Sequence, residues 1–107
     1  MNEQYNNEIH NLIYSHKIIA FIKGNKLKPM CGFSDTVIQI LNKFNINYYT
    51  VDVLKNNKIR KNIKLYSQWP TIPQVYINRE FIGGADILLD LYNTYKLHEI
   101  LEKFTNS

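Results

Sequence analysis

The sequence predicts an α/β fold, in which a four-stranded mixed sheet carries helices on both faces. Two runs rich in β-branched and aromatic residues, at 18–23 and 48–53, alternate with segments whose apolar residues recur at helical spacing. Two further short runs, at 73–77 and 80–83, are separated by only two residues, which is typical of a β-hairpin. A βαβ unit followed by a hairpin and a helix builds such a sheet with short connections.

The first third of the chain predicts a helix, a buried strand and a loop. Residues 3–15 carry apolar side chains at helical spacing and are expected to form a short amphipathic helix. The run IIAFIK at 18–23 is continuously β-branched or aromatic up to its last residue, which is typical of a strand buried on both faces. Gly24 and Pro29 mark residues 24–30 as a loop.

The middle of the chain predicts a helix, a strand and a second helix. In residues 33–44, apolar side chains recur one turn apart, which indicates a helix. The stretch YYTVDV at 48–53 indicates a second strand. Apolar residues at positions 59, 63 and 66 then define a helix from about 56 to 67.

The last third predicts the hairpin and two helices. The strands PQVYI at 73–77 and EFIG at 80–83 are joined by Asn78-Arg79. Apolar residues at helical spacing in 87–92 and 97–104 predict the last two helices. The resulting order, αβαβαββα with a terminal helix, is that of the thioredoxin-like fold.

Length and composition predict a single domain, 1–107, with its core at about 16–104. The chain has 107 residues, of which 45% are hydrophobic, and this is enough for one packed core. The formal net charge of +4 is mild and the lysines are spread along the chain. A solvated, lysine-rich surface explains this charge, so we expect no nucleic-acid partner.

Cys31 is the single cysteine, which excludes an internal disulfide and a CxxC pair and favours a reducing intracellular compartment. No apolar run approaches the length of a membrane-spanning helix, so no membrane partner is expected. The N-terminal residues show neither a signal-peptide core nor a transit-peptide pattern. We therefore expect the cytoplasm, or the mitochondrial or another organelle matrix if a leader has been removed.

Cys31 lies between the first strand and a helix that starts near Gly32 or Phe33. Free N–H groups and the helix dipole favour an anion there, so the pKa of the thiol is expected to fall. Lys23 and Lys28 add positive potential. The alternative is an inert, buried cysteine, and the position at the start of a helix favours the reactive thiol.

The stretch WPTIP at 69–73 holds two prolines directly before a strand, where both cannot join a regular ladder. A cis peptide before Pro73 is expected, since cis bonds belong almost entirely to X–Pro. Such a bend leaves the backbone N–H and C=O of Ile72 free to pair with an extended peptide ligand. A rigid turn that only sets the strand register explains the prolines equally well.

The stretch GGAD at 83–86 combines two glycines with a possible N-cap, Asp86, for the next helix. In the functional interpretation, the N–H groups here hold a ligand carboxylate and Asp86 meets a ligand amine. A plain cap on a flexible turn explains Asp86 as well.

Arg60 and Lys64 share one face of their predicted helix, offset from its apolar residues, and two cations one turn apart suit a carboxylate. Ordinary solvated charges are the more frequent explanation. His10, His16 and His98 show no metal-ligand spacing with Cys31 and are interpreted as surface residues. Trp69 and the tyrosines are interpreted as core or rim aromatic residues.

Together these stretches resemble the monothiol, CGFS-type glutaredoxins. The resemblance is carried by PMCGFS at 29–34, IRKNIKLYSQWPTIPQVYI at 59–77 and EFIGGADI at 80–87, with KG at 23–24. It extends from residue 18 to about residue 101, and the combination of CGFS, WPTIP and GGxD at this spacing is highly specific.

The resemblance implies a thioredoxin fold that binds glutathione and holds a 2Fe–2S cluster between two subunits, for transfer to apo iron–sulfur proteins. It implies that Cys31 is both the catalytic thiol and the cluster ligand. It further implies glutathione-binding roles for Lys23, Phe33, Arg60, Lys64, Thr71, Ile72, Pro73, Gly84, Ala85 and Asp86. A BolA-type protein is a further partner that the resemblance suggests.

A ligand count agrees with this implication, because a 2Fe–2S cluster takes four ligands and one chain provides one sulfur. Two chains and two glutathiones complete the set, which predicts a dimer that separates when the cluster leaves. The alternative function is enzymatic: Cys31 would attack protein–glutathione mixed disulfides as a glutathione-dependent oxidoreductase. By the resemblance, this activity is at most weak. A thioredoxin-fold adaptor without redox chemistry is the least favoured alternative.

Three features of the sequence depart from the family pattern. Ala85 stands where relatives often carry cysteine or serine, which removes a second thiol able to pair with Cys31. Arg79 occupies a hairpin position where glycine is common, so a different turn type is expected. Leu27-Lys28 makes the loop before Pro29 more basic than usual, which bears on the choice of partner.

Overall fold

The computed structural model describes residues 3–105 and places nine helices and strands among them. They are α1 (Glu3–Ser15), β1 (Ile18–Ile22), α2 (Gly32–Leu41), β2 (Tyr49–Asp52), α3 (Asn57–Ser67), β3 (Gln74–Ile77), β4 (Glu80–Gly83), α4 (Ala85–Asn93) and α5 (Lys96–Thr105). The order of these elements is the one that the sequence predicts.

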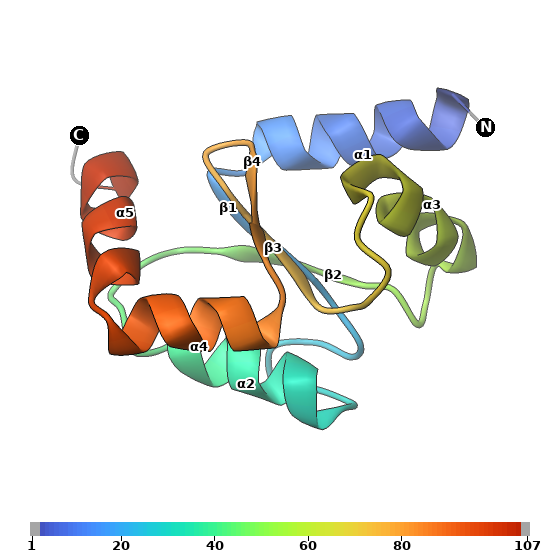
Figure 1. The fold of residues 1–107 in the computed structure, drawn as a ribbon. Coiled ribbons are helices and arrows are strands. Elements are labelled where there is room, and N and C mark those ends of the chain that lie inside the picture. The colour runs from blue at the N-terminus through green and yellow to red at the C-terminus, as the bar shows by residue number, and fades with distance from the viewer. Residues whose placement is uncertain (1–2, 106–107) are drawn as a thin grey trace.

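The four strands form one mixed sheet in the order β2-β1-β3-β4. β1 runs parallel to β2 and antiparallel to β3, and β3 pairs with β4 in the predicted hairpin. Helices cover both faces of this sheet, with α1 and α3 on one side and α2 and α4 on the other (Figure 1). The predicted thioredoxin-like fold is therefore confirmed.

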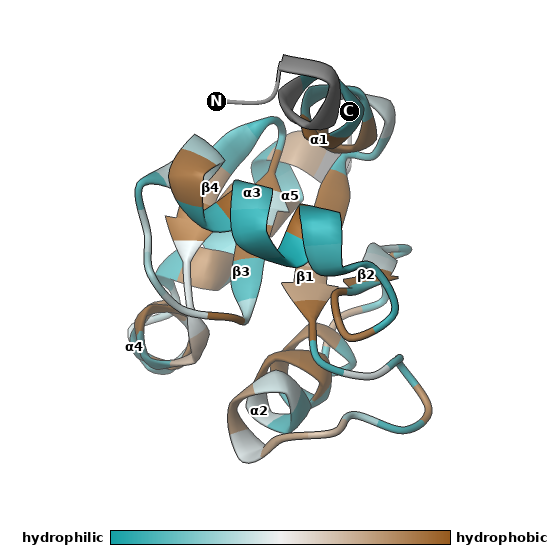
Figure 2. Ribbon diagram, turned by 90° about the vertical axis from the view of Figure 1, so that its right-hand side faces the viewer, coloured by the Kyte–Doolittle hydropathy of each residue, from teal (hydrophilic) through white to brown (hydrophobic). Residues whose placement is uncertain are grey.

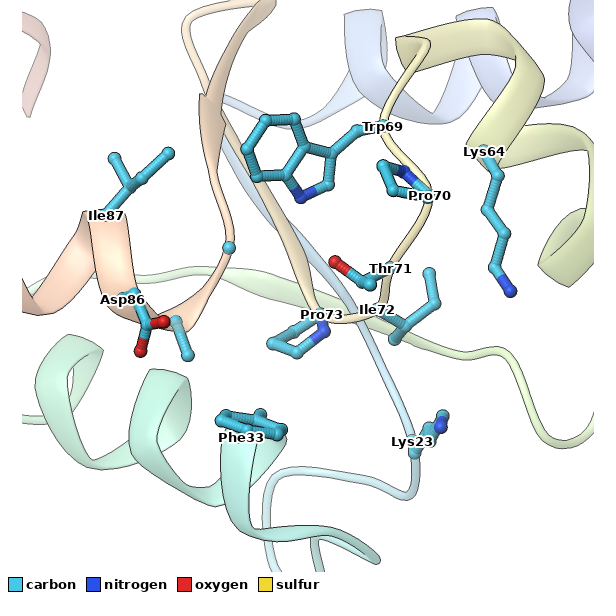
Figure 3. Close-up of a pocket in the computed structure, with 12 residues that line it drawn as sticks. Lys23, Phe33, Lys64, Trp69, Pro70, Thr71, Ile72, Pro73, Asp86 and Ile87 are labelled. Atoms are coloured by element: carbon cyan, nitrogen blue, oxygen red, sulfur yellow. The ribbon is translucent and has the colours of Figure 1, made fainter.

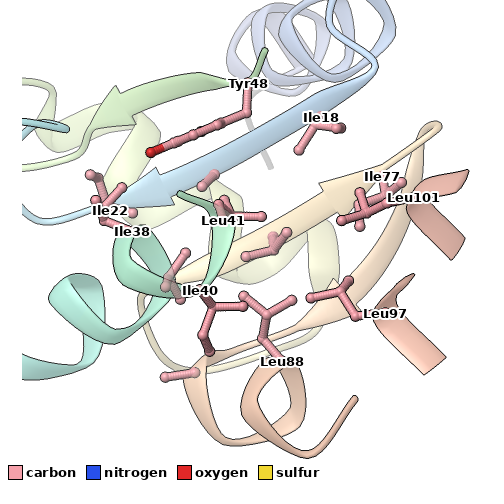
Figure 4. Close-up of a cluster of buried hydrophobic side chains, with 14 residues drawn as sticks. Ile18, Ile22, Ile38, Ile40, Leu41, Tyr48, Ile77, Leu88, Leu97 and Leu101 are labelled. Carbon is pink, nitrogen blue, oxygen red and sulfur yellow. The ribbon is translucent and has the colours of Figure 1, made fainter. Parts of the chain in front are cut away.

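β1 is the centre of the core because all five of its residues are buried. Ile18, Ala20 and Ile22 face α2, α4 and α5, in the larger of two buried clusters (Figure 4). Ile19 and Phe21 point to the opposite cluster, which α1 and α3 cover. The alternation of side chains along a strand thus explains why a continuous apolar run suits this position.

α2 ends at Leu41, three residues before the predicted end at residue 44. The chain tightens there, because the N–H groups of Lys43 and Phe44 donate to carbonyls only three residues back, at 3.1 and 3.2 Å. The Tyr48 hydroxyl donates to Asn42 Oδ1 at 2.6 Å. Phe44 contributes to packing against α5 instead of continuing the helix.

His98 is half-buried, so the interpretation as a surface residue holds only for part of its side chain. Its ring centroid lies 4.8 Å from that of Phe44, 5.2 Å from that of Tyr92 and 5.0 Å from that of Tyr95. Its Nδ1 atom is buried without a hydrogen-bond partner in the described part of the chain. The reason is its position on α5 directly after the buried Leu97, which brings the ring against the aromatic end of α4.

The β3–β4 turn keeps positive φ angles at both central residues, 49° at Asn78 and 73° at Arg79. This is the pattern of a type I′ hairpin, so the expectation of a different turn type is wrong. The Arg79 guanidinium carbon lies 4.5 Å from the ring centroid of Tyr14, which offsets part of the backbone strain by a cation–π contact. Within residues 3–105, no helix is both long and apolar enough to cross a membrane.

Candidate functional site

An open groove of about 430 Å³ lies where the loop after α3 meets the start of α4 (Figure 3). Its walls come from five places in the sequence that the fold brings together: the end of β1, the first turn of α2, α3, the segment after α3 and the start of α4. The lining residues are Lys23, Phe33, Lys64, Trp69, Pro70, Thr71, Ile72, Pro73, Gly84, Ala85, Asp86 and Ile87.

Cys31 is the N-cap of α2, next to this groove but not part of its lining. Its backbone is extended, with φ −153° and ψ 157°, and its carbonyl accepts the N–H of Asp35 at 3.0 Å. The sulfur takes the place of the usual capping oxygen by accepting the N–H of Ser34 at 3.4 Å. The side chain is half-buried, so the sulfur is held by the helix and still open to solvent.

The pKa of Cys31 lies below its usual value. Burial by itself raises the pKa, but the hydrogen bonds from the Ser34 hydroxyl and N–H outweigh it, together with the charge of Lys23 and the N–H of Phe33. The hydrogen bonds and the lysine charge all favour the thiolate. The predicted depression of the pKa thus has its main cause in Ser34 rather than in the lysine.

Ser34 is a functional residue that the sequence analysis missed. It is fully buried, and its Oγ accepts the backbone N–H of Lys23 at 3.0 Å while lying 3.2 Å from Cys31 Sγ. The neutral Cys31 thiol donates to Ser34 Oγ. When the thiol is ionised, the Ser34 hydroxyl donates to the sulfur instead. No signal in the sequence indicated this role, because it depends on the burial of Ser34.

The segment from Trp69 to Pro73 forms one wall, and the Ile72–Pro73 peptide is cis as predicted. Gln74, fully buried, donates from its amide to the carbonyls of Trp69 at 3.1 Å and Thr71 at 3.2 Å. Among the described residues, no hydrogen bond uses the backbone N–H or C=O of Ile72. The wall is therefore fixed by the sheet, while Ile72 keeps its pairing groups for a ligand.

Trp69 belongs to the groove as well as to the rim packing that the sequence suggests. Its ring centroid lies 5.5 Å from that of Phe81. Its Nε1 atom is buried and has no hydrogen-bond partner within the described residues. Figure 3 shows this nitrogen directed toward the middle of the groove.

Gly84, not Asp86, is the N-cap of α4, so the predicted cap is wrong. The helix begins at Ala85, two residues earlier than an Asp86 cap allows, and Asp86 lies in its first turn with its side chain exposed. No side chain caps the helix. A Cβ at Gly84 would lie 3.2 Å from the Pro73 carbonyl oxygen, so the absence of a side chain lets the two walls approach each other.

Two of the three predicted cations reach the groove. Lys23 follows β1 and Lys64 lies on α3, and both line the cavity. Arg60 lies one turn earlier on α3 and outside the lining. The groove therefore offers two ammonium groups, an uncapped helix N-terminus, the carboxylate of Asp86 and a free backbone edge at Ile72. These groups match a short peptide with two carboxylates and one amine: the ammonium groups and the helix N-terminus suit the carboxylates, and Asp86 suits the amine.

The fold and this site define a thioredoxin-like protein with one half-exposed thiol of lowered pKa at a helix start, beside a groove that suits a small peptide. The glutaredoxin family profile matches residues 14–82. The chain belongs to the glutaredoxin family and, within it, to the monothiol glutaredoxins.

Individual comparisons agree with this assignment. The monothiol glutaredoxin ycf64 of Porphyra purpurea is 55% identical over 94 residues, which is 88% of each chain. The solution structure of reduced poplar apo GrxS14 has a TM-score of 0.82 and 43% identity, and the match covers 95% of this chain and 94% of that one.

Relatives named for organelles are also similar. The chloroplastic monothiol glutaredoxin-S14 of Arabidopsis thaliana is 45% identical over 100 residues, 94% of this chain and 58% of the relative. The mitochondrial glutaredoxin-related protein 5 of Danio rerio is 45% identical over 93 residues, 86% of this chain and 60% of the relative.

Proposed function

We propose that this protein binds glutathione in the groove and, with a second copy of the chain, holds a 2Fe–2S cluster that it passes to apo iron–sulfur proteins. The observation that carries the proposal is the position of Cys31. The only cysteine of the chain caps a helix beside the groove, half-exposed and with its thiolate form favoured. A thiolate in such a place is a metal ligand open to a second molecule.

The groove supports the glutathione half of the proposal. Glutathione is a short peptide with two carboxylates, one amine and a central thiol. One carboxylate would face Lys23 and Lys64, and the other would meet the uncapped first turn of α4. Asp86 would hold the amine. Ile72 would pair with the cysteinyl backbone and so direct the ligand's sulfur toward Cys31.

The number of available ligands supports the second copy. In the part of the chain that the structure describes, no three His, Cys, Asp or Glu side chains gather as a metal site. A 2Fe–2S cluster takes four ligands. Cys31 from each of two chains and the thiolate of one glutathione on each supply them, and the half-exposed sulfur fits such a shared position.

Transfer from this site is ligand exchange without redox change. The iron–sulfur bonds to Cys31 and to glutathione break as bonds to the cysteines of the acceptor form. The acceptor thiols lose their protons, which the released thiolates of Cys31 and glutathione can take up. A lowered pKa of Cys31 makes it a ready leaving ligand, because a less basic thiolate is a weaker donor to iron.

Anaerobic reconstitution with ferrous iron, sulfide and glutathione tests the proposal. The wild-type chain should become coloured and elute as a dimer, whereas Cys31→Ser should remain colourless and monomeric. Omission of glutathione should also prevent cluster uptake. A coloured Cys31→Ser dimer, or full uptake without glutathione, would contradict the assigned ligands.

The lowered pKa of Cys31 favours one other function, the removal of glutathione from protein mixed disulfides. In that reaction Cys31 attacks the glutathione sulfur, the protein thiol leaves, and a second glutathione reduces the intermediate to give glutathione disulfide. The assay compares this turnover with cluster uptake in one preparation. Fast turnover by the apo protein, without cluster uptake, would make the enzymatic function the main one.

We further propose a reducing compartment for the protein, since a lone thiol with a lowered pKa is oxidised elsewhere. An organelle is consistent with the chloroplastic and mitochondrial relatives. A BolA-type protein is a candidate partner, and co-purification with loaded protein tests it.

A further inference from the structure

We propose that the loop between β1 and α2 is the docking surface for the acceptor protein, and that the acceptor presents an apolar patch bordered by acidic groups. This inference rests on the proposed cluster transfer. The loop comprises residues 24–30 and carries Leu27 at its tip, where 97% of the leucine is exposed. It stands clear of the helices and strands between the end of β1 and α2 (Figure 2).

The loop is held by hydrogen bonds rather than left loose. Asn25 Oδ1 accepts the N–H groups of Leu27 and Lys28, each at 2.9 Å, and the backbones of Asn25 and Lys28 pair in both directions at 3.2 Å. Met30 donates its N–H to the Lys23 carbonyl at 2.8 Å. A fixed loop loses little conformational entropy on binding, so it is suited to present a contact residue.

The base of the loop is also fixed. Gly24 has a φ of +97°, and a Cβ there would lie 2.4 Å from the Lys28 carbonyl oxygen. Its N–H donates to Asp52 Oδ1 at 3.0 Å, which ties the loop to the end of β2. Lys26 closes the other side, with its ammonium bonded to the Tyr48 carbonyl and 4.1 Å from the centroid of that ring. The position of Leu27 is thus set by the structure around it.

The exposed apolar residues near the thiol extend beyond Leu27. Met30 is 57% exposed and Phe33 63%, on either side of Cys31. Leu27 is four residues from Cys31, so at most about 14 Å of chain separates them. Exposed leucine, methionine and phenylalanine contribute little to folding, whereas the same residues form the buried centre of a protein contact.

The charge around this patch selects an acidic partner. Lys26 and Lys28 lie in the loop and Lys23 directly before it, whereas the acidic residues beside it are Asp52, which accepts the Gly24 N–H, and Asp35 in the first turn of α2. Lys28 is exposed and follows Leu27 directly in the loop. A basic rim around an apolar centre attracts an acidic protein surface and speeds its association, which is the property that a transfer step requires.

Cluster transfer to an acidic apo-ferredoxin is the test, with each variant preloaded with its cluster. Leu27→Ala and Lys28→Glu should slow transfer by about tenfold, because a central apolar contact and a rim charge control docking. Transfer by the wild type should also slow with added salt, and this dependence should weaken in Lys28→Glu. The matched controls are Leu65→Ala, at a 61% exposed leucine on α3, and Lys61→Glu on the same helix.

Equal rates in all five proteins would overturn the docking surface. A failure of Leu27→Ala to load or to dimerise would overturn it in favour of a contact with the second copy of the chain. If Leu27→Ala lost binding to phosphatidylglycerol vesicles but transferred the cluster at the wild-type rate, the loop would bind an anionic membrane and not the acceptor, which would overturn the proposal.

A cluster-free measurement separates this inference from the proposed function. Methyl NMR signals of Leu27 and Leu65 in the apo protein are followed while acidic apo-ferredoxin is added. A shift of Leu27 alone supports docking even if the protein takes up no cluster, in which case the transfer function falls and the surface stands. An unmoved Leu27 signal overturns the surface whatever the cluster does.

Discussion

The two helices whose first turns border the groove, α2 and α4, begin in opposite ways. At α2 the cap is Cys31, whose sulfur accepts the Ser34 N–H at 3.4 Å. At α4 the cap is Gly84, and no side chain accepts any N–H of the first turn. Both helix starts carry partial positive charge. The start of α2 is therefore occupied by the sulfur of the chain itself, whose ionised form it favours, while the start of α4 remains free for an anion that arrives with the ligand.

The largest effect on glutathione binding is expected from a substitution that adds a side chain at the uncapped start of α4. In Gly84→Ala the new Cβ would lie 3.2 Å from the Pro73 carbonyl oxygen and 3.6 Å from Trp69 Nε1, inside the groove. We expect glutathione affinity, measured by calorimetry, to fall at least about tenfold, the size of effect that overpacking produces.

Gly32→Ala is the matched control at the other helix, because a Cβ there meets nothing within 4 Å. This variant should bind glutathione like the wild type. Thermal unfolding of both variants shows whether a loss of affinity reflects a loss of fold. Unchanged affinity in Gly84→Ala would mean that the start of α4 does not receive the ligand.

A smaller effect should distinguish the cations of α3. Lys64 lines the groove and Arg60 does not, so Lys64→Ala should weaken glutathione binding about fivefold and Arg60→Ala less than twofold. The loss in Lys64→Ala should shrink at high salt. Titrations at two salt concentrations measure both quantities. Equal losses would return Arg60 to the role that the sequence resemblance implies.

The start of α2, which Cys31 caps, can be tested by titrating the Cys31 thiol. Because the pKa of Cys31 lies below its usual value, alkylation by iodoacetamide should reach half of its maximal rate at a lower pH than for a free cysteine. Ser34→Ala removes the hydroxyl that favours the thiolate and should move this midpoint upward. Thr36→Ala, which removes a hydroxyl bonded to the Gly32 carbonyl at 3.0 Å, should leave it in place.

The same pKa predicts a small pH dependence of stability. A thiol whose pKa is lower in the folded than in the unfolded chain stabilises the fold above the unfolded value, and this contribution is lost as the pH falls through the folded value. Urea unfolding at several pH values should show this loss in the wild type, and Cys31→Ser should not show it. An identical pH profile in both would exclude the thiolate as a stabilising group.

The smallest effect is expected at the β3–β4 turn, which lies at the end of the sheet away from both helix starts. Arg79→Gly removes the strain of a φ of 73° but also the contact with Tyr14. The two terms oppose each other, so the free energy of unfolding should change by less than about 1 kcal/mol. Glutathione affinity should not change. A weaker affinity would show that the hairpin turn is coupled to the groove.

The periodicity of the sequence was sufficient for the fold and weaker at the ends of elements. The apolar run of β1 could only be a strand with both faces covered, and it is fully buried. The end of α2 was missed because Phe44 fits a helical pattern, while the turn that stops the helix depends on Asn42 and on a tyrosine six residues further on. Periodicity carries no information about such contacts.

The candidate site was likewise predicted only in part from the sequence. Motif spacing indicated which segments meet, and nine of the predicted residues line the groove. Ser34 and Gln74 were missed because their roles depend on burial, and a buried serine or glutamine looks like any other in the sequence. The cap at Gly84 was missed because Asp86 has the better capping side chain, whereas the fold leaves that helix start uncapped.

Trp69 has a practical consequence, since it is the only tryptophan in the chain and belongs to the groove wall. All indole fluorescence of the protein therefore originates at the place where the ligand is proposed to bind. Occupancy of the groove can be followed through this intrinsic emission, with no label attached and no residue altered.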